Sequence, residues 1–398
     1  MEIVQTLLAK MGIFRKPQIK TLTTLFATII IACGKVNFTN LSRYSQRTER
    51  TYRRQFKKQF DFAVFNAEVI KAATPENNSM IAVMDCSFIA KSGKKTFELD
   101  QFYNGNHNRV EKGLEVSLVA VVDVETEVGY ALLAEQTFDR GFCPDLTRTD
   151  YYLHHLEITQ PQLPPQVRYL AVDGAYAKEP FVTGVKTLKL DVISKLRRDA
   201  NLRYVFEGKQ KARGAKRKYD GKVDLADPNR LSWVREVQSG VELYTAVVWH
   251  VSFKRKIRLA YLLDRRHPDK PSYAVLLSTD INQSADEIYR FYKLRFQIEF
   301  IFRDAKQFTG LNDCQARDVK KLDFHFNASF TALNIAKFDA HRQQLRQKPF
   351  VFSMASVKRR ALNDHLLDTF ISTLGLSETV IKSHPNYQNL RSYGVIAA

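Results

Sequence analysis

The sequence predicts an α/β protein: a mixed sheet flanked by helices, with an inserted antiparallel β region and a helical N-terminal domain. Three observations predict this class. Strand-like apolar runs alternate with helical patterns between residues 78 and 200. Further strand-like runs follow one another between residues 231 and 278. Before residue 72 the apolar residues recur at helical spacing.

The length and the charge of the chain limit the number of domains and the class of partner. A chain of 398 residues is long enough for two or three domains and a large core. Its net charge of +19 predicts a polyanionic partner, and nucleic acid is favoured over a membrane because no apolar run is long enough to span a bilayer. The four cysteines form no C-x-x-C pair, which argues against structural zinc and fits a reducing, cytoplasmic compartment.

The N-terminal part, residues 1–72, is predicted to be helical. Residues 17–33 have the apolar spacing of a buried helix. A short helix and a polar turn follow, and Ser45 can cap a second, strongly basic helix. This arrangement resembles a helix-turn-helix, which predicts that Arg47 and Arg50 contact DNA. The alternative is an ordinary basic surface helix.

Residues 78–200 contain three strand-like runs, a helix, a strand, a helix and a strand. The first strand, residues 81–84, ends at Asp85, and the fourth, residues 167–172, ends at Asp173. This order matches an RNase H-like mixed sheet flanked by helices. In that fold the first and fourth strands are neighbours, so the two carboxylates are expected to lie side by side. A divalent cation relieves the repulsion between two such groups.

The region from 201 to 276 is predicted to be an antiparallel β insertion. It begins with a loop that contains six lysines and arginines between residues 209 and 218, which favours contact with phosphates. The strand-like runs that follow contain both tryptophans of the chain, Trp233 and Trp249. Core packing is the alternative to a binding role for at least one of them.

The segment 284–306 is predicted to form one helix, which a capping box begins at Ser284. Apolar residues on both sides of a charged stripe, including Phe296 and Phe300, predict that the helix is buried on most sides. The alternative is a solvated surface helix with an ordinary salt bridge. At about 100° per residue, four functional side chains project within roughly 60° of one another: Tyr292, Arg295, Glu299 and Lys306.

These residues together resemble a known family. Asp85 in VMDCSF, Asp173 in AVDGAYAK and the spacing Tyr-x2-Arg-x3-Glu-x6-Lys resemble the three characteristic regions of the insertion sequence 4 family of DDE transposases. The resemblance covers roughly residues 80–340. The catalytic part is therefore expected to combine residues 78–200 and 277–345, and residues 346–398 to form a C-terminal helical tail.

The resemblance implies a function and a set of roles. Asp85, Asp173 and Glu299 would bind two Mg²⁺ ions, for which Mn²⁺ can substitute, and would catalyse cut-and-paste DNA transposition. Its partners would be double-stranded DNA, in the form of transposon ends and target, and a second copy of the chain in the active complex. In this family Tyr292, Arg295 and Lys306 would hold end DNA, and a tryptophan of the insertion, Trp233 or Trp249, would stack on a flipped base.

Two alternatives remain open at this level. An RNase H-like nuclease would cut strands without joining them to a target. A DNA-binding protein that has lost catalysis would bind without cutting, although the intact acidic triad argues against it.

Overall fold

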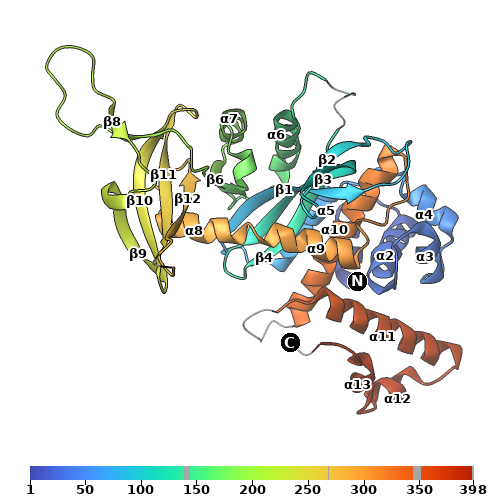
Figure 1. The fold of residues 1–398 in the computed structure, drawn as a ribbon. Helices are drawn as coiled ribbons and strands as arrows, with labels where there is room; N and C mark the ends of the chain where they lie inside the picture. Colours follow the sequence, from blue (N-terminus) through green and yellow to red (C-terminus); the bar gives the residue numbers. More distant parts are fainter. Residues whose placement is uncertain (139–140, 142–143, 268, 344–350, 397–398) are drawn as a thin grey trace.

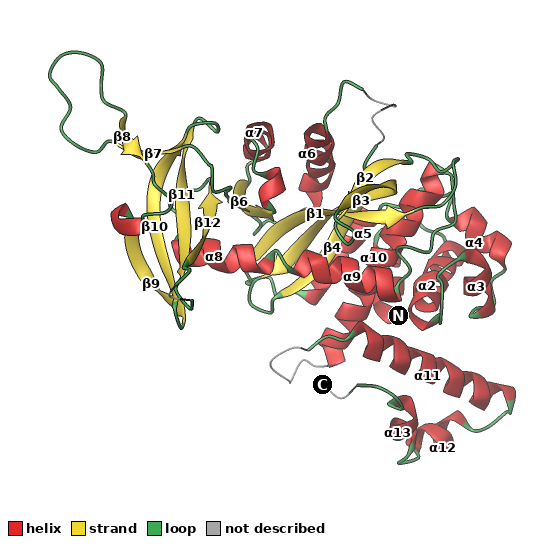
Figure 2. Ribbon diagram, viewed as in Figure 1, coloured by secondary structure: helices red, strands yellow, loops and turns green. Residues whose placement is uncertain are grey.

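The computed structural model describes residues 1–138, 141, 144–267, 269–343 and 351–396. A mixed twelve-stranded sheet runs through the molecule, with helices on both faces (Figures 1 and 2). Its main strand order is β2-β3-β1-β5-β6-β12-β11-β10-β7-β8, while β4 pairs with β3 and β9 with β10. The predicted α/β class with a mixed sheet is therefore confirmed.

The first half of the sheet reproduces the predicted order of strands and helices and adds one strand, β2. Pairing is antiparallel for β1–β3, β2–β3 and β3–β4, and parallel for β1–β5 and β5–β6. The elements are β1 (Met80–Ala90), β2 (Asp100–Asn104), β3 (Arg109–Asp123), β4 (Val128–Gln136), α6 (Arg148–Thr159), β5 (Tyr169–Val172), α7 (Glu179–Thr187) and β6 (Asp191–Lys195).

The position of Asp85 within its strand differs from the prediction. Asp85 is not at the end of β1 but near its middle, because β1 continues to Ala90 through its antiparallel pairing with β3. The parallel pairing of β1 with β5 nevertheless stops at Met84 and Val172. Asp85 is therefore the first residue of β1 beyond that pairing, and Asp173 is the first residue after β5.

The inserted strands continue the same sheet rather than forming a separate one. Strand β12 pairs antiparallel with β6 through Ser278 and Ile193, which joins the two halves. The runs predicted from the sequence form β9 to β12, and β7 and β8 precede them. The bounds are β7 (Leu202–Val205), β8 (Tyr219–Lys222), β9 (Ser232–Gln238), β10 (Val241–His250), β11 (Arg255–Asp264) and β12 (Ser272–Ser278).

The segment predicted to be one helix is two helices. These are α8 (Ala285–Leu294) and α9 (Gln297–Phe308), which run across the sheet in Figure 1. Ser284 begins α8 with the predicted capping box. The interruption at Arg295 and Phe296 arises because backbone hydrogen bonds there tighten to a spacing of three residues, from Phe296 N–H to the Lys293 carbonyl and from Ile298 N–H to the Arg295 carbonyl.

The N-terminal part is helical, with two helices that the sequence pattern did not predict, Glu2–Lys10 and Phe62–Ala73, and with a basic helix that begins only after Arg47. Thr48, not Ser45, caps α4, because its hydroxyl accepts from the Thr51 N–H. The Ser45 hydroxyl instead lies 2.7 Å from the Tyr52 hydroxyl and donates to the Leu41 carbonyl. The helices are α1 (Glu2–Lys10), α2 (Lys16–Ile31), α3 (Phe38–Arg43), α4 (Glu49–Gln55) and α5 (Phe62–Ala73).

The long helix α10 (Val319–Gln343) closes the edge of the sheet at β4. The amide of Asn334 accepts from the Ala131 N–H at 3.0 Å and donates to its carbonyl at 2.7 Å. Asn327 forms the same pair of bonds with Ala134, both at 2.9 Å. Side-chain amides thus take the place of a neighbouring strand, which satisfies backbone groups that would otherwise be unpaired.

Three helices follow α10 in the described part of the C-terminal region: α11 (Met354–Thr373), α12 (Glu378–Ser383) and α13 (Tyr387–Arg391). The expected boundary between residues 345 and 346 lies outside the described residues. Among the helices of the described part, none combines the length and the apolar character that crossing a bilayer requires.

Candidate active site at the end of the parallel strands

Two aspartates lie together where the parallel strands β1 and β5 stop pairing. Asp85 and Asp173 each follow the last paired residue of their strand. Because side chains alternate along a strand, Asp85 faces α8 and α9 while Cys86 faces α6, where its sulfur lies 3.6 Å from the Tyr152 hydroxyl. The parallel pairing thus brings together two carboxylates that are 88 residues apart in sequence.

The turn between α8 and α9 places Arg295 directly over these carboxylates. Its Nη1 lies 3.5 Å from the Asp85 carboxylate and its Nη2 donates to Glu299 at 3.0 Å. The guanidinium lies beside the rings of Tyr292 and Phe296, whose centroids are 5.6 and 4.9 Å away. One buried cation therefore connects a carboxylate of the sheet with a carboxylate of α9.

Arg295 is nonetheless incompletely paired. Its side chain is 7% exposed, and its Nε has no hydrogen-bond partner within the part of the chain that the structure describes. Burial of an unpaired donor is unfavourable. The contact with Asp85 is also at the long limit for a hydrogen bond. The geometry leaves donor capacity for an anionic ligand at this point.

The two remaining members of the stripe lie on either side of Arg295. Tyr292, on α8, is partly buried, and burial raises the pKa of its hydroxyl. Lys306, near the end of α9, donates to the Phe88 carbonyl of β1 at 2.9 Å, and burial lowers the pKa of its ammonium. The four predicted residues therefore share one side of α8 and α9, in spite of the interruption between the helices.

Electrostatics at the site favour the arrival of a cation. Burial is the largest cause that raises the pKa of Asp85 to about 6, and the charges of Asp173 and Glu299 raise it further. The Cys86 N–H and the Arg295 guanidinium oppose this shift. A carboxylate whose charge is disfavoured by burial and by two acidic neighbours gains from an additional positive charge.

The donor set suits a hard divalent cation. Asp85, Asp173 and Glu299 provide carboxylate oxygens, which Mg²⁺ prefers. Asp85 and Glu299 both bond the single guanidinium of Arg295, so their oxygens already converge on one positive group. Within the described residues no three His, Cys, Asp or Glu side chains are close enough to hold a metal ion as they stand. The residues fit such an ion in type, and their side chains must draw closer to ligate it.

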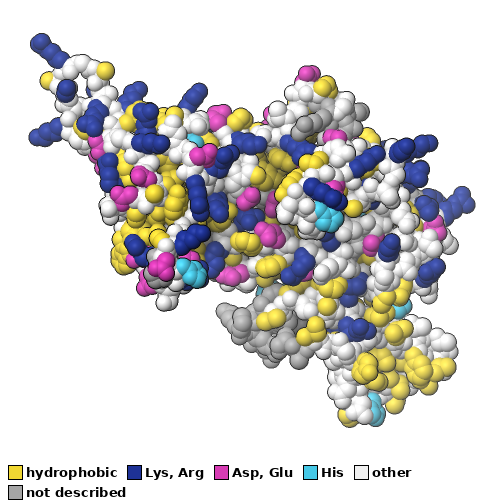
Figure 3. Space-filling view, in the orientation of Figure 1, with side chains coloured by type: hydrophobic (Ala, Val, Ile, Leu, Met, Phe, Trp, Pro, Cys, Tyr) yellow, Lys and Arg dark blue, Asp and Glu magenta, His cyan; other side chains and the backbone are white. Residues whose placement is uncertain are grey.

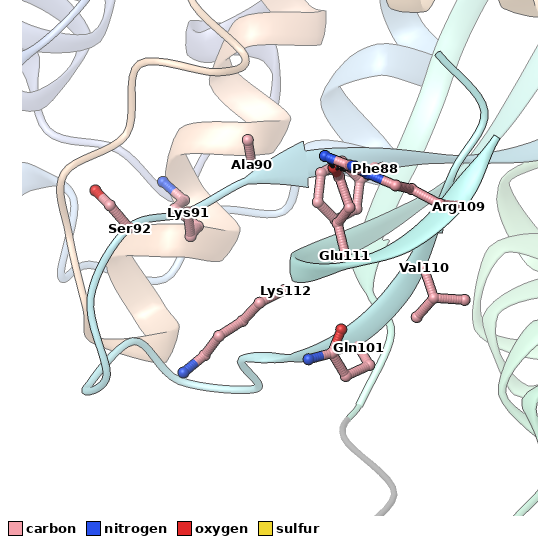
Figure 4. A pocket seen from close by; sticks show the side chains of 9 residues that line it. All are labelled: Phe88, Ala90, Lys91, Ser92, Gln101, Arg109, Val110, Glu111 and Lys112. Carbon is pink, nitrogen blue, oxygen red and sulfur yellow. Dashed lines mark hydrogen bonds and ion pairs between the residues drawn. The ribbon is translucent and has the colours of Figure 1, made fainter. Parts of the chain in front are cut away.

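An open hollow lies beyond Lys306, on the surface of β1, β2 and β3. Its volume is about 820 Å³. Figure 4 shows Lys91, which follows β1, and Arg109 and Lys112 of β3 around it, together with Glu111. Glu111 is bonded to Arg109 at 2.6 Å. The hollow therefore has a basic rim and begins next to Phe88, whose carbonyl Lys306 contacts.

The predicted peripheral DNA-binding residues lie away from this centre. Arg50 is exposed on α4, and Arg47 is partly exposed before that helix. Trp233 is 61% exposed on β9, whereas Trp249 is partly covered and lies 6.0 Å from the Tyr219 ring. Basic side chains gather along the loop before β8 and around α4 (Figure 3).

The predicted burial of Phe296 and Phe300 is wrong. These rings are 48% and 44% exposed, because they lie on the solvent side of α9. The residues that bury α9 include Ile298, Ile301 and Ala305. At about 100° per residue, the two phenylalanines lie roughly 150° around the helix from that face. A helical wheel of α9 alone therefore indicates that these two phenylalanines face away from the buried side.

The sequence reasoning also missed a buried polar cluster behind Asp85. The Tyr152 hydroxyl of α6 donates to Glu115 of β3 at 2.8 Å, and Arg148 lies 3.7 Å from the same carboxylate. Burial and the nearby carboxylates raise the pKa of the Cys86 thiol, so that thiol stays protonated. These residues support β1 from the face opposite to Arg295. Only the i,i+4 spacing of Arg148 and Tyr152 on one helix hinted at this arrangement.

Comparison with known families gives one result. A family model described as a transposase DDE domain matches residues 79–335, well over half of the chain. The matched segment begins just before β1 and ends within α10, and it includes both aspartates and the two helices that cross them. A search of curated proteins found no match.

Proposed function

This chain belongs to the family of proteins with a transposase DDE domain, and from that membership we propose that it is a cut-and-paste DNA transposase of the insertion sequence 4 type. As a member of this family it is an enzyme that acts on DNA. The observation that carries the finer proposal is the convergence of Asp85 and Glu299 on Arg295, with Asp173 on the neighbouring strand.

We assign the catalytic and metal-binding role to Asp85, Asp173 and Glu299. Two Mg²⁺ ions, or Mn²⁺ in their place, would be held by these carboxylates and would supply activation of the attacking hydroxyl and stabilisation of the leaving oxygen. The exposed half of Glu299 and the partly buried Asp85 leave one open side, from which a phosphodiester can approach. Burial of Asp85 keeps bulk water away from the opposite side.

Arg295, Tyr292 and Lys306 would hold the phosphates that flank the scissile bond. Arg295 carries a buried, partly unpaired guanidinium, which can bond a phosphate in a bidentate manner. Lys306 is fixed against the Phe88 carbonyl at the edge of the hollow. Burial lowers the pKa of Lys306, and the negative charge of a nearby phosphate would offset this by favouring the charged ammonium.

Two reactions would then follow at the same carboxylates, the first on a phosphate of the transposon end and the second on a phosphate of target DNA. In the first, water attacks phosphorus at the transposon end, and the 3′ oxygen leaves as a free hydroxyl. In the second, that hydroxyl attacks a phosphodiester of target DNA, and a target 3′ oxygen leaves. Both reactions are in-line displacements at phosphorus, so one set of carboxylates can serve both. The first breaks a phosphate ester by hydrolysis, whereas strand transfer forms one ester for each ester that it breaks.

The remaining parts of the chain would bind DNA and a second copy. Residues 1–72 would form a helix-turn-helix-like domain that contacts transposon ends through Arg47 and Arg50, and the insertion 201–276 would stack Trp233 on a base. Exposed apolar residues gather over α11 to α13 (Figure 3), where the C-terminal tail, residues 346–398, would support a homodimer in the active complex. The enzyme would act in the cytoplasm of a prokaryote, on the nucleoid.

A nuclease without strand transfer is the second candidate. The carboxylate arrangement where β1 and β5 stop pairing is compatible with hydrolysis alone, because both reactions use the same residues. The product separates them: a transposase leaves its 3′ hydroxyl joined to target DNA, and a nuclease leaves it free.

The test uses linear DNA that carries the ends of the chain's own genetic element, a target plasmid, and either Mg²⁺ or EDTA. We expect metal-dependent nicking at the ends and joined products, both absent in Asp85→Ala. DNA that is nicked at the ends but never joined to the target would indicate a nuclease without strand transfer. Activity in EDTA, or activity that survives Asp85→Ala, would overturn the assigned chemistry.

A further inference from the structure

We infer that Tyr152 of α6 is a positioning residue for metal binding, because it holds the backbone that carries Asp85 and the backbone that carries Asp173 at a fixed separation. This inference rests on the proposed function and adds to it a residue outside the predicted site. Tyr152 lies on the face of the sheet opposite to Arg295, so it would touch neither the ion nor the scissile phosphate. It contacts one residue next to Asp85 and one residue in the turn that Asp173 begins.

The first contact leads to Asp85 through Cys86. The Tyr152 hydroxyl lies 3.6 Å from the Cys86 sulfur. The backbone N–H of Cys86 donates to the Asp85 carboxylate at 2.9 Å. A displacement of Cys86 therefore also displaces the donor that orients this carboxylate. Because successive side chains of a strand point to opposite faces, Tyr152 can act on this peptide without entering the site.

The second contact leads to Asp173 through Tyr176. These two residues are the ends of the DGAY segment, in which Gly174–Tyr176 form a short 3₁₀ helix. The Tyr176 N–H donates to the Asp173 carbonyl at 3.0 Å and closes the turn. The buried Tyr176 ring packs against the ring of Tyr152, with the centroids 5.0 Å apart. The position of Tyr152 therefore fixes where the turn after β5 can lie.

Tyr152 is itself held by β3. Its hydroxyl donates to the Glu115 carboxylate at 2.8 Å. Arg148, one turn earlier on α6, lies 3.7 Å from the same carboxylate and donates to the Gln101 carbonyl of β2 at 3.2 Å. The Glu115 side chain is 6% exposed, so loss of the hydroxyl would leave a buried carboxylate with one donor fewer. The hydroxyl thus ties α6 to β3, the strand that pairs with β1.

Close packing of α6 on α7 restrains the other end of the turn. A Cβ atom at Gly184 of α7 would lie 2.5 Å from the Leu153 side chain of α6, so the glycine permits this close approach. Helix α7 begins at Glu179, three residues after Tyr176. The DGAY turn is therefore held between β5 and a helix that packs on α6, and Tyr152 is the neighbour of Leu153 on α6.

Metal binding depends on this arrangement because the carboxylates must move to ligate an ion. Within the described residues, Asp85, Asp173 and Glu299 are not yet close enough to hold one. The free energy that this movement costs lowers metal affinity, and a backbone that is already fixed keeps the cost small. Replacing groups that support the ligands of a metal typically changes affinity or activity by about 10- to 100-fold.

The experiment measures metal binding separately from catalysis. The probe is Mn²⁺, titrated into the protein bound to a pre-cleaved duplex of the element's end, and electron paramagnetic resonance follows free Mn²⁺. Binding at the site is the difference from Asp85→Ala. Tyr152→Phe removes the hydroxyl and keeps the ring, and we expect it to weaken this binding by about 10-fold. The Mg²⁺ concentration for half-maximal cleavage should rise by a similar factor, whereas cleavage at saturating Mg²⁺ and affinity for end DNA should change much less.

Tyr261→Phe is the matched control. Tyr261 is fully buried on β11, and its hydroxyl donates to the Leu225 carbonyl at 3.0 Å, so this variant loses a buried tyrosine hydrogen bond elsewhere in the same sheet. It should bind Mn²⁺ like the wild type. Equal Mn²⁺ affinity of Tyr152→Phe and the wild type would overturn the inference. Equal weakening in both Tyr→Phe variants would also overturn it, because a general loss of stability would then explain the effect.

Cys86→Ala is the second variant, which decides the matter if Tyr152→Phe does not fold. It removes the sulfur between Tyr152 and the Asp85 peptide and leaves the bond from Tyr152 to Glu115. Its Mn²⁺ binding should also weaken, and unchanged binding would overturn the inference. A wild-type protein that binds no more Mn²⁺ than Asp85→Ala and cuts no ends would overturn the proposed function, and this inference with it.

Discussion

Two of the places where buried polar side chains meet the sheet differ in how completely those side chains are hydrogen-bonded. Where α10 closes the edge at β4, the amides of Asn327 and Asn334 each form two bonds of 2.7–3.0 Å with backbone groups. Beside Asp85, the buried Arg295 makes one bond of 3.0 Å and one contact of 3.5 Å, and its Nε has no partner in the described part of the chain.

This difference separates stability from function. The hydrogen bonds of the Asn327 and Asn334 amides hold β4 and α10 in one arrangement, because loss of any of them would leave buried groups unpaired. An incomplete set beside Asp85 costs stability and leaves groups for a ligand to satisfy. We therefore expect substitutions at α10 to act on folding and substitutions beside Asp85 to act on DNA binding and chemistry.

The largest expected effect is that of Glu299→Gln on cleavage. This change removes a charge from the carboxylate set with little change in volume, so cleavage of element ends should fall by about 1000-fold or more. The thermal midpoint of unfolding should stay within a few degrees of the wild type, because the Glu299 side chain is half exposed. Gel-based cleavage and thermal unfolding measure the two quantities. Cleavage at the wild-type rate would remove Glu299 from the catalytic set.

Asn334→Ala should have the largest effect on stability. It leaves the Ala131 N–H and carbonyl unpaired and removes a 3.1 Å bond to Asn66, so the free energy of unfolding should fall by about 2–4 kcal/mol. Urea unfolding measures it, with the exposed Gln307→Ala on α9 as control. If cleavage by the folded Asn334→Ala protein also fell strongly, the separation of the two regions would be contradicted.

Arg295→Ala should act on DNA rather than on folding. Loss of its charge-assisted contacts should weaken binding to element ends by about 10-fold or more. Lys293→Ala removes one positive charge two residues earlier, at an exposed position, and should change affinity much less. Fluorescence anisotropy with labelled ends compares the two variants. Equal losses would mean that only net charge matters and that the position of Arg295 does not.

The smallest expected effect concerns a like-charged pair in the α10 region. Burial, and then the charge of Asp323, raises the pKa of Glu135 to about 7, and burial raises that of Asp323 to about 6. The folded chain thus binds more protons than the unfolded chain between about pH 4.5 and 7. Stability therefore falls as pH rises through this window.

Glu135→Gln removes the part of this dependence that comes from Glu135 and leaves the part that burial of Asp323 causes. Its free energy of unfolding should exceed that of the wild type by about 1 kcal/mol at pH 8 and should differ little at pH 5. Urea unfolding at the two pH values gives the result. A difference of the same size at both pH values would point to packing rather than to the charge of Glu135.

Local patterns determined much of this protein. Apart from β2, the strand and helix order from residue 80 to 195 follows from hydrophobic spacing, and the start of α8 follows from the Ser284 capping box, because these signals depend on neighbouring residues. The spacing of Tyr292, Arg295, Glu299 and Lys306 also sufficed to place them on one side of the two helices.

The tertiary structure decided what depends on distant segments. The length of β1 beyond Asp85 comes from its pairing with β3, and the continuity of the insertion with the main sheet comes from the pairing of β12 with β6. The exposure of Phe296 and Phe300 was indicated by the helical wheel of α9, but which elements cover the opposite side of that helix was decided by the tertiary structure. Burial is a property of what packs against a residue. Of the elements that pack against α9, β1 and β4 lie more than a hundred residues away in sequence, whereas α10 and α11 follow it closely.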